Sequence, residues 1–245
     1  MFNFFSKTDR SLNAFEFLGT DMHSHLLPGV DDGSNSVMTS LELIEGLKAL
    51  GFNKIITTPH VYQDFYPNTK DTLEPAFKAV KQALLLNSIE MDFQFSAEYF
   101  ADDFLHEMIN KRELISLPNK HLLIEISFVA YSKQLEQLVF ELTTLGFTPI
   151  LAHPERYLYL NERHFNTYKK LISLGCKLQL NINSLGGYYG KSSQKLAFAL
   201  LEARLVTFLG TDIHNFRHLE FLNGIAQNNS LMQTLRKYPW SNDTF

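Results

Sequence analysis

The sequence predicts an α/β fold in which parallel strands close into a barrel covered by helices. Short apolar runs alternate with segments of helical periodicity along all 245 residues, and no linker or low-complexity tract interrupts them. Repeated βα units favour parallel strands with helices packed on them. Seven strands can be counted, which predicts a seven-stranded (β/α) barrel formed by a single domain over residues 1–245.

The strands are the short apolar runs, and the helices fill the intervals between them. The strands are expected at residues 17–22, 54–58, 92–97, 121–127, 149–152, 177–181 and 206–210. Apolar residues in the intervals recur every three or four positions, as in Leu135, Leu138 and Leu142, which is typical of an amphipathic helix. The helices are expected at residues 38–50, 72–86, 135–145, 164–174 and 192–204.

Three helix-to-strand junctions share the pattern of Leu, Gly and then an apolar residue. They lie at Gly51, Gly146 and Gly175. Glycine adopts the left-handed conformation after a helix without a Cβ penalty, and the next residue packs back on the last turn. The repeat therefore supports the alternation of helices and strands.

The two ends of the chain are expected to lie outside the barrel proper. Residues 1–16 are interpreted as an N-terminal strap and residues 241–245 as a loose tail. The phenylalanine-rich segment 1–5 is too short for a signal-peptide core or a membrane span. It either packs on the barrel, frays, or makes a loose contact with a membrane or partner.

Composition excludes several classes of function. The net charge is −4 and no long Lys/Arg run occurs, so nucleic acid is not an expected partner. Stable insertion into a membrane is not expected either. Cys176 is the single cysteine, which favours a reducing, cytoplasmic location. Cysteine phosphatases carry an arginine six positions after the nucleophile, and here that position is Ile182, so Cys176 is interpreted as a buried apolar residue.

Histidines and acids follow the predicted strands. Two residues apart on a strand, His23 and His25 project to the same side. Further candidates end other strands: His60, Glu98, Glu125, His153, Asp212 and His214. Parallel barrels build their sites on this rim. Imidazole and carboxylate ligands suit zinc, manganese or iron, so the set predicts a metal-dependent hydrolase.

These segments resemble the PHP (polymerase and histidinol phosphatase) superfamily, and within it the bacterial protein-tyrosine phosphatases of capsule and exopolysaccharide loci. The most specific match is the stretch 21–33, DMHSHLLPGVDDG. The other matches are TTPH ending at His60, SAEY around Glu98, LIEI around Glu125, AHPER through Arg156 and GTDIHN through Asn215. The resemblance implies a distorted seven-stranded barrel with three divalent metal ions, which agrees with the strand count.

The resemblance also implies how the ligands divide among the metals. The first metal would take His23, His25, Glu98 and Asp212; the second Glu98 as a bridge with Glu125 and His153; the third Asp32, His60 and His214. Asp32 is preferred to Asp31 from the motif, since spacing alone does not separate them. A carboxylate at Glu125 fits the tyrosine-phosphatase branch. Manganese is the expected metal, with iron and zinc as alternatives.

The expected reaction is hydrolysis of a phosphate monoester by a hydroxide held on the metals. Arg156 follows His153 by three residues, and its guanidinium matches phosphate bidentately. Catalysis is assigned to Arg156 together with Asp32, His60 and His214. Arg217 is either a second phosphate-binding residue or part of a surface ion pair.

The implied substrate is the phosphotyrosine-rich tail of a bacterial tyrosine kinase that controls capsule or exopolysaccharide synthesis. One alternative is a PHP phosphatase for a small phosphomonoester such as histidinol phosphate. Another is a regulator that binds metal and a phosphopeptide without turnover. The loop aromatics Tyr62, Phe65 and Tyr66 either stack on the substrate ring or only pack together.

Overall fold

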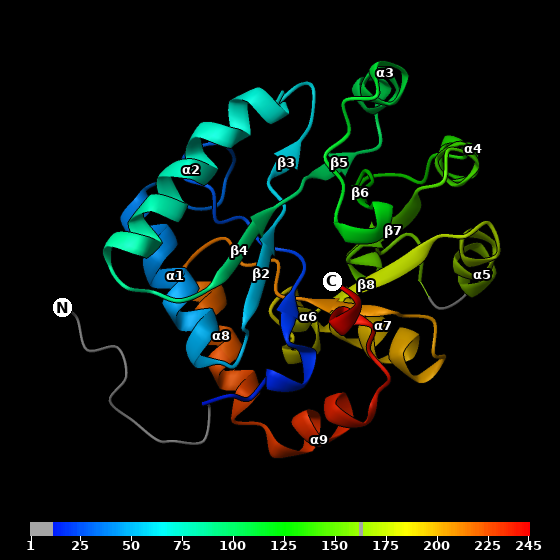
Figure 1. Ribbon diagram of the computed structural model, residues 1–245. Coiled ribbons are helices and arrows are strands. Elements are labelled where there is room, and N and C mark those ends of the chain that lie inside the picture. The colour runs from blue at the N-terminus through cyan, green and yellow to red at the C-terminus, as the bar shows by residue number, and fades with distance from the viewer. Residues whose placement is uncertain (1–11, 162–163) are drawn as a thin grey trace.

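The computed structural model describes residues 12–161 and 164–245, and it is an α/β structure with helices placed around parallel strands (Figure 1). The strands are β1 (Thr20–Asp21), β2 (Lys54–Thr57), β3 (His60–Val61), β4 (Asp92–Phe95), β5 (Glu98–Phe100), β6 (His121–Glu125), β7 (Thr148–Ala152), β8 (Lys177–Asn181) and β9 (Phe208–Gly210). The helices are α1 (Val37–Ala49), α2 (Lys70–Leu86), α3 (Asp103–Lys111), α4 (Gln134–Thr144), α5 (Phe165–Ser173), α6 (Ile182–Gly186), α7 (Lys191–Glu202), α8 (Phe216–Ala226) and α9 (Asn229–Lys237).

These strands form two sheets, and all pairings between the named strands are parallel. The three-stranded sheet has the order β1-β2-β4, and the six-stranded sheet has the order β3-β5-β6-β7-β8-β9. The strands predicted at residues 54–58 and 92–97 correspond to β2 and β4, and each is followed by a further short strand that was not predicted, β3 or β5. Both segments therefore pass from one sheet to the other. The predicted α/β fold with parallel strands is confirmed, whereas one continuous ring of seven strands stays a prediction.

The first and last β segments meet beside the His-x-His motif. Ser24 and Ile213 form an isolated parallel bridge. The Asp212 main-chain N–H donates to the His23 carbonyl oxygen at 2.8 Å. The buried Asp21 carboxylate accepts hydrogen bonds from the main-chain N–H and the hydroxyl of Thr211, at 3.0 and 2.7 Å. These contacts bring segments about 190 residues apart in sequence to one edge.

Alternate residues of the strands enter different parts of the core. Leu123 of β6 belongs to a small apolar cluster with side chains from neighbouring strands, including Ile150 and Phe208. Its neighbours Leu122 and Ile124 belong to the larger core that the helices cover. The strands are therefore buried on both faces, as parallel strands under helices require.

Several elements differ from their predicted bounds. The strand expected at residues 17–22 is reduced to β1, because Glu16–Leu18 forms a 3-10 turn that ends at Gly19. Helices α3, α6, α8 and α9 were not predicted. The three junction glycines do adopt positive φ angles, which confirms the predicted helix ends at Gly51, Gly146 and Gly175. Cys176 is buried, as expected.

The C-terminal residues 241–245 differ from the loose tail expected from the sequence. Asn242 is 1% exposed, its amide donates to the carbonyl oxygens of Thr20 and Leu209, and its oxygen accepts the Leu209 N–H. Phe245 packs on Phe208 with ring centroids 4.9 Å apart. The tail therefore joins β1 to β9 at the end of the strands opposite the His-x-His motif.

At the other terminus, the phenylalanine-rich segment 1–5 and the rest of residues 1–11 lie outside the described residues. Of the predicted strap, Phe15 is fully buried and stacks on Phe52 at 5.7 Å. Among the helices that the structure describes, none has the length and apolar character needed to cross a membrane.

We expect Asn242→Ala to lower the free energy of unfolding by about 1–3 kcal/mol, because the buried Leu209 N–H would lose its partner. Denaturant unfolding followed by circular dichroism measures the change. Asp243→Ala is the matched control, since Asp243 is exposed in the same turn, and it should stay within about 0.5 kcal/mol of wild type. Equal stabilities of the two variants would contradict the assigned role of Asn242.

Candidate metal centre

The nine predicted ligands converge in one region, and all but one lie beside the ends of strands. The residues are His23 and His25 after β1, Asp32 in the following loop, His60 at β3, Glu98 at β5, Glu125 ending β6, His153 after β7, and Asp212 and His214 after β9. Their nitrogen and oxygen atoms form four groups close enough to hold a cation: His25, Asp32, His60 and His214; His23, Glu98 and His153; His23, His25 and Asp212; and His60, Glu98 and Glu125.

Four of the most deeply buried ligands, drawn from these overlapping groups, lie close together: His23, His25, Glu98 and Asp212. The Nε2 atoms of His23 and His25 lie 3.4 Å apart, and each lies 3.3–3.4 Å from Glu98 Oε2 and from Asp212 Oδ1. Charge-assisted hydrogen bonds are shorter, about 2.7–2.9 Å. Ligand atoms about 2.0–2.1 Å from one tetrahedral cation would lie about 3.3–3.4 Å from one another. Glu98 Oε2 is buried and has no hydrogen-bond partner among the described residues. These four residues therefore fit a divalent cation.

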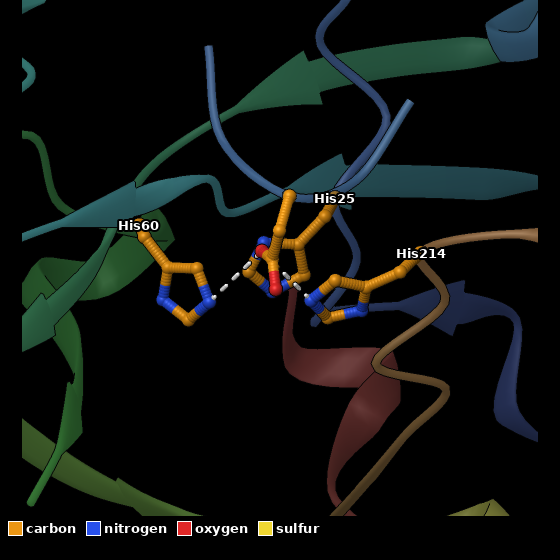
Figure 2. Close-up of side chains that lie close together, drawn as sticks. His25, His60 and His214 are labelled. Atoms are coloured by element: carbon orange, nitrogen blue, oxygen red, sulfur yellow. Dashed lines mark ion pairs between the residues drawn. The ribbon is translucent and has the colours of Figure 1, made fainter. Parts of the chain in front are cut away.

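A second group lies closer to solvent and contains three imidazoles. Figure 2 shows the rings of His25, His60 and His214 approaching one another from three separate segments. Asp32 Oδ1 lies 3.5 Å from His60 Nε2 and 3.4 Å from His214 Nε2. His214 Nδ1 hydrogen-bonds to the Asp212 carbonyl oxygen at 2.9 Å, which leaves His214 Nε2 toward Asp32. This arrangement favours Asp32 over Asp31 as the ligand.

Glu98 and Glu125 both lie near two further histidines, His153 and His60. His153 Nε2 lies 3.0 Å from Glu98 Oε1 and 3.5 Å from Glu125 Oε2. His60 Nδ1 lies 3.2 Å from Glu98 Oε2 and 4.0 Å from Glu125 Oε1. The family resemblance assigns His60 to the third metal alone, but in the structure its two ring nitrogens face two different groups.

Burial and mutual repulsion set the charges of this cluster. Burial opposes ionisation of Glu98, yet the neighbouring His23 and His60 hold its pKa well below the usual range. Burial and the Glu98 carboxylate raise the pKa of Glu125 well above its usual value. Burial, together with Arg156, lowers the pKa of His153 to about 4, so its imidazole is neutral. Neutral imidazole is the form that binds metals, and a cation would relieve the repulsion between the carboxylates.

Local backbone conformation presents two of the candidate ligands. His153 and Asp212 have φ angles of 33° and 49°, a left-handed conformation that non-glycine residues rarely adopt. Such strain clusters at functional sites. The loop that carries Asp32 folds back because Gly33 lies against the His25 carbonyl oxygen, where a Cβ atom would collide.

Arg156 is held at the edge of the cluster by two aromatic rings. Its guanidinium carbon lies 4.8 Å from the Phe128 ring centroid and 4.3 Å from that of Tyr189. One guanidinium nitrogen, Nη1, donates to Asp212 Oδ2 at 3.0 Å. Guanidinium carries five N–H donors, so others can bind an anion in the adjoining cavity.

That cavity has a volume of about 560 Å³ and opens over the candidate ligands. Its lining includes six aromatic side chains: Tyr62, Phe65, Tyr66, Phe100, Phe128 and Tyr189. Tyr62 stacks on Phe100 with centroids 4.1 Å apart, and Phe65 is 67% exposed. The cavity therefore combines a charged floor with apolar walls, a combination suited to a phosphorylated aromatic group.

Arg217 does not share this cavity. It is exposed in the first turn of α8 and lines a separate cavity of about 440 Å³ with Glu220 and Phe221. The next residue, His218, lines the cavity over the candidate ligands, whereas Arg217 does not. This placement gives no support to the expectation that Arg217 binds phosphate.

Sequence reasoning missed several residues around the cluster. Asp31 and Gln179 hydrogen-bond to the rings of His25 and His23. His218 is buried, lines the cavity and contacts the Asp212 carbonyl oxygen with Nδ1 at 3.1 Å. Gln179 lies between two leucines of an apolar strand, and a polar residue at such a position indicates a specific buried contact. For His218, the sequence gives no indication of a role other than its spacing from His214.

Comparison with known proteins places these residues in a family context. The family model for capsular polysaccharide synthesis, CpsB/CapC, matches residues 19–220. The chain is 31% identical over 202 residues to the tyrosine-protein phosphatase YwqE of Bacillus subtilis, covering 82% of this chain and 79% of that protein. It is also 31% identical over 202 residues to the tyrosine-protein phosphatase CpsB of Streptococcus agalactiae, covering 80% of this chain and 82% of the relative.

Two solved structures are similar to this one. The first comes from a study of YwqE of Bacillus subtilis and CpsB of Streptococcus pneumoniae, described as metal-dependent tyrosine phosphatases. It has a TM-score of 0.79 and 26% identity, and covers 92% of this chain and 90% of that chain. The second, a phosphotriesterase homology protein of Escherichia coli, has a TM-score of 0.52 and 16% identity, and covers 97% of this chain and 96% of that chain. The second similarity concerns the fold alone.

We expect Glu98→Gln to lose more bound metal than Asp32→Asn, because Glu98 belongs to two of the four groups and Asp32 to one. Elemental analysis of the purified, manganese-loaded proteins measures the metal content per chain. Glu107→Gln is the control, since Glu107 is an exposed residue paired with Lys111. A full metal complement in Glu98→Gln would contradict the central position of this carboxylate.

Proposed function

The chain belongs to the CpsB/CapC family of capsular polysaccharide synthesis proteins, and from that premise we propose that it is a metal-dependent protein-tyrosine phosphatase, a phosphoric monoester hydrolase. The observation that carries the proposal is the cavity itself. Buried imidazoles and carboxylates spaced for cations form its floor, Arg156 lies at its edge, and aromatic rings form its walls.

Three divalent ions per chain would be held by the nine residues, with manganese preferred and iron or zinc as alternatives. Following the family resemblance, His23, His25, Glu98 and Asp212 would hold the first ion, Glu98, Glu125 and His153 the second, and Asp32, His60 and His214 the third. The four groups in the structure contain the same nine residues but divide them differently, since Glu98 is grouped once with His23 and His153 and once with His60 and Glu125. When bound, such ions supply a water that ionises near neutral pH and draw charge from phosphoryl oxygens.

The chain's own residues would bind and orient the phosphoryl group. Arg156 offers planar donors to its oxygens, and the two rings beside the guanidinium keep it from rotating. Asp32, His60 and His214 are the most exposed of the candidate ligands that line the cavity, so they would be accessible to the reacting phosphate. These four residues are therefore the proposed catalytic set.

The aromatic walls favour a phosphorylated phenol over a small polar phosphomonoester. A tyrosine ring would pack against the aromatic side chains that line the cavity, among them Phe65, Tyr66 and Phe128. Its phenoxide leaving group, with a parent pKa of about 10, needs little help from a general acid. Histidinol phosphate carries an ammonium that calls for a free carboxylate. The acids lining the cavity are Asp32, Glu125 and Asp212, and all three belong to the proposed metal centre.

The physiological substrate would be a phosphotyrosine-rich tail of a bacterial tyrosine kinase controlling capsule or exopolysaccharide synthesis. The names of the relatives, which are tyrosine-protein phosphatases, support this step. A seven-stranded barrel over residues 1–245 is part of the same proposal. It is supported by the nine parallel strands of the described residues, which become seven segments when β2 with β3 and β4 with β5 are each taken as one, and by the contact between Ser24 and Ile213. The cytoplasmic location expected from the single cysteine stays a prediction.

We expect the manganese-loaded protein to hydrolyse phosphotyrosine peptides with a much higher kcat/KM than histidinol phosphate, because only the former can use the aromatic walls. Release of inorganic phosphate from both substrates measures this ratio. A preference for histidinol phosphate would overturn the substrate assignment. Tight peptide binding without turnover in the fully loaded protein would favour a non-catalytic regulator.

We expect Arg156→Ala to lower kcat/KM about 10²–10³-fold, the loss typical of removing one charge-stabilising donor at a reaction centre. Its metal content should remain, because Asn181 Nδ2 also donates to Asp212 Oδ2, at 2.8 Å. Steady-state kinetics and elemental analysis of the same preparation measure both. Arg217→Ala serves as the control and should retain the wild-type rate, and an equal loss in both variants would argue against a specific role for Arg156.

A further inference from the structure

Both histidines of the His-x-His motif carry a second partner on the ring nitrogen that faces away from the proposed cations. His23 Nδ1 lies 2.8 Å from Gln179 Oε1, and His25 Nδ1 lies 2.8 Å from Asp31 Oδ2. Both partner side chains are buried, and neither belongs to any of the four candidate metal groups. Gln179 and Asp31 can therefore influence metal binding only through the histidines that they contact.

Each partner also holds the backbone of another candidate ligand. Gln179 Oε1 accepts the main-chain N–H of His153 at 3.4 Å, and Asp31 Oδ2 accepts that of His60 at 3.1 Å. Each oxygen thus joins the ring of one histidine to the backbone of a histidine from a different segment. For His153 the contact falls on a backbone in the unusual left-handed conformation, which needs support from its surroundings.

The partners are themselves fixed, and this decides which atom of Gln179 faces His23. Gln179 Nε2 donates to the Leu180 carbonyl oxygen at 2.8 Å, so Oε1 is the atom left for His23. An amide oxygen only accepts, so His23 Nδ1 carries a proton, and in the neutral ring Nε2 then presents its lone pair to the cluster. Asp31 is fixed in a similar way, since its Oδ1 accepts the Gly33 N–H at 3.0 Å.

We infer that Gln179 and Asp31 are paired positioning residues that set the tautomer and orientation of His23 and His25, so that both Nε2 atoms face the cations. Partners of this kind tune ligand basicity, and their loss typically weakens metal binding about 10–100-fold. The two differ in charge, so they would act unequally: the Asp31 carboxylate makes His25 the more strongly donating ligand, while the neutral Gln179 mainly orients His23.

The inference rests on the proposed metal centre, and it can be tested without measuring activity. Manganese affinity of the metal-free protein is measured by chelator competition for wild type, Gln179→Met, Asp31→Leu and Asp31→Asn. Gln194→Met is the matched control, because Gln194 Nε2 also donates to a main-chain oxygen, that of Leu185, but belongs to α7 and lines no metal group. Long-range ¹H–¹⁵N spectra of the metal-free wild type report the tautomer of His23.

We expect manganese to bind about 10–100-fold more weakly to Gln179→Met and Asp31→Leu, with a smaller loss in Asp31→Asn, which keeps an acceptor oxygen. The wild-type spectrum should show His23 protonated on Nδ1. Wild-type affinity in the two apolar variants, or a wild-type His23 protonated on Nε2, would overturn the inference. If a variant fails to fold, the spectrum of the wild type still tests the inference, because it reports which nitrogen of His23 is protonated. Failure of the wild type itself to bind manganese would instead count against the proposed metal centre.

Discussion

Repulsion among buried carboxylates is the constraint on which the rest of the site depends. Glu98, Glu125 and Asp212 are nearly or fully buried within one small volume, and burying charges is costly unless they are paired. Burial and the Glu98 carboxylate raise the pKa of Glu125, so a positive charge beside these two acids would stabilise the ionised pair. Divalent cations would supply that charge, and the spacings of 3.3–3.4 Å between the Nε2 atoms of His23 and His25 and the facing carboxylate oxygens suit ligands of one cation.

The fold brings these charges together because the segments that carry the ligands lie beside the ends of several different strands. Parallel strands bring their carboxyl ends to one side, and the contacts between Asp21 and Thr211 hold the first segment against the last. At the opposite end Asn242 ties the same two segments together. The buried apolar cluster that includes Leu123 and Ile150 lies between these two ends of the strands, so the ligands are supported by close-packed side chains.

Much of this arrangement could be predicted from the sequence, because residue type and position at the end of an apolar run are local features. His23, His60, Glu98 and their companions were recognisable for that reason. Contacts between distant segments could not be predicted, because even an unusual residue such as Gln179 in an apolar strand does not show which distant residue it meets. The bond from Gln179 to His23 joins residues 156 positions apart, and Asn242 sits in a polar tail without periodicity. The separate roles of Asp31 and Asp32 depend on how the loop folds around Gly33, which spacing does not reveal.

Asp212 connects the two halves of the proposed chemistry. Its Oδ1 faces the nitrogens of His23 and His25, while its Oδ2 accepts hydrogen bonds from Arg156 and Asn181. One carboxylate thus contacts both the proposed cation site and the proposed phosphate-binding arginine. Because Phe128 and Tyr189 already fix the guanidinium plane, a phosphate would meet donors in a set orientation relative to the cations. Binding and catalysis would therefore share one preorganised structure rather than two independent ones.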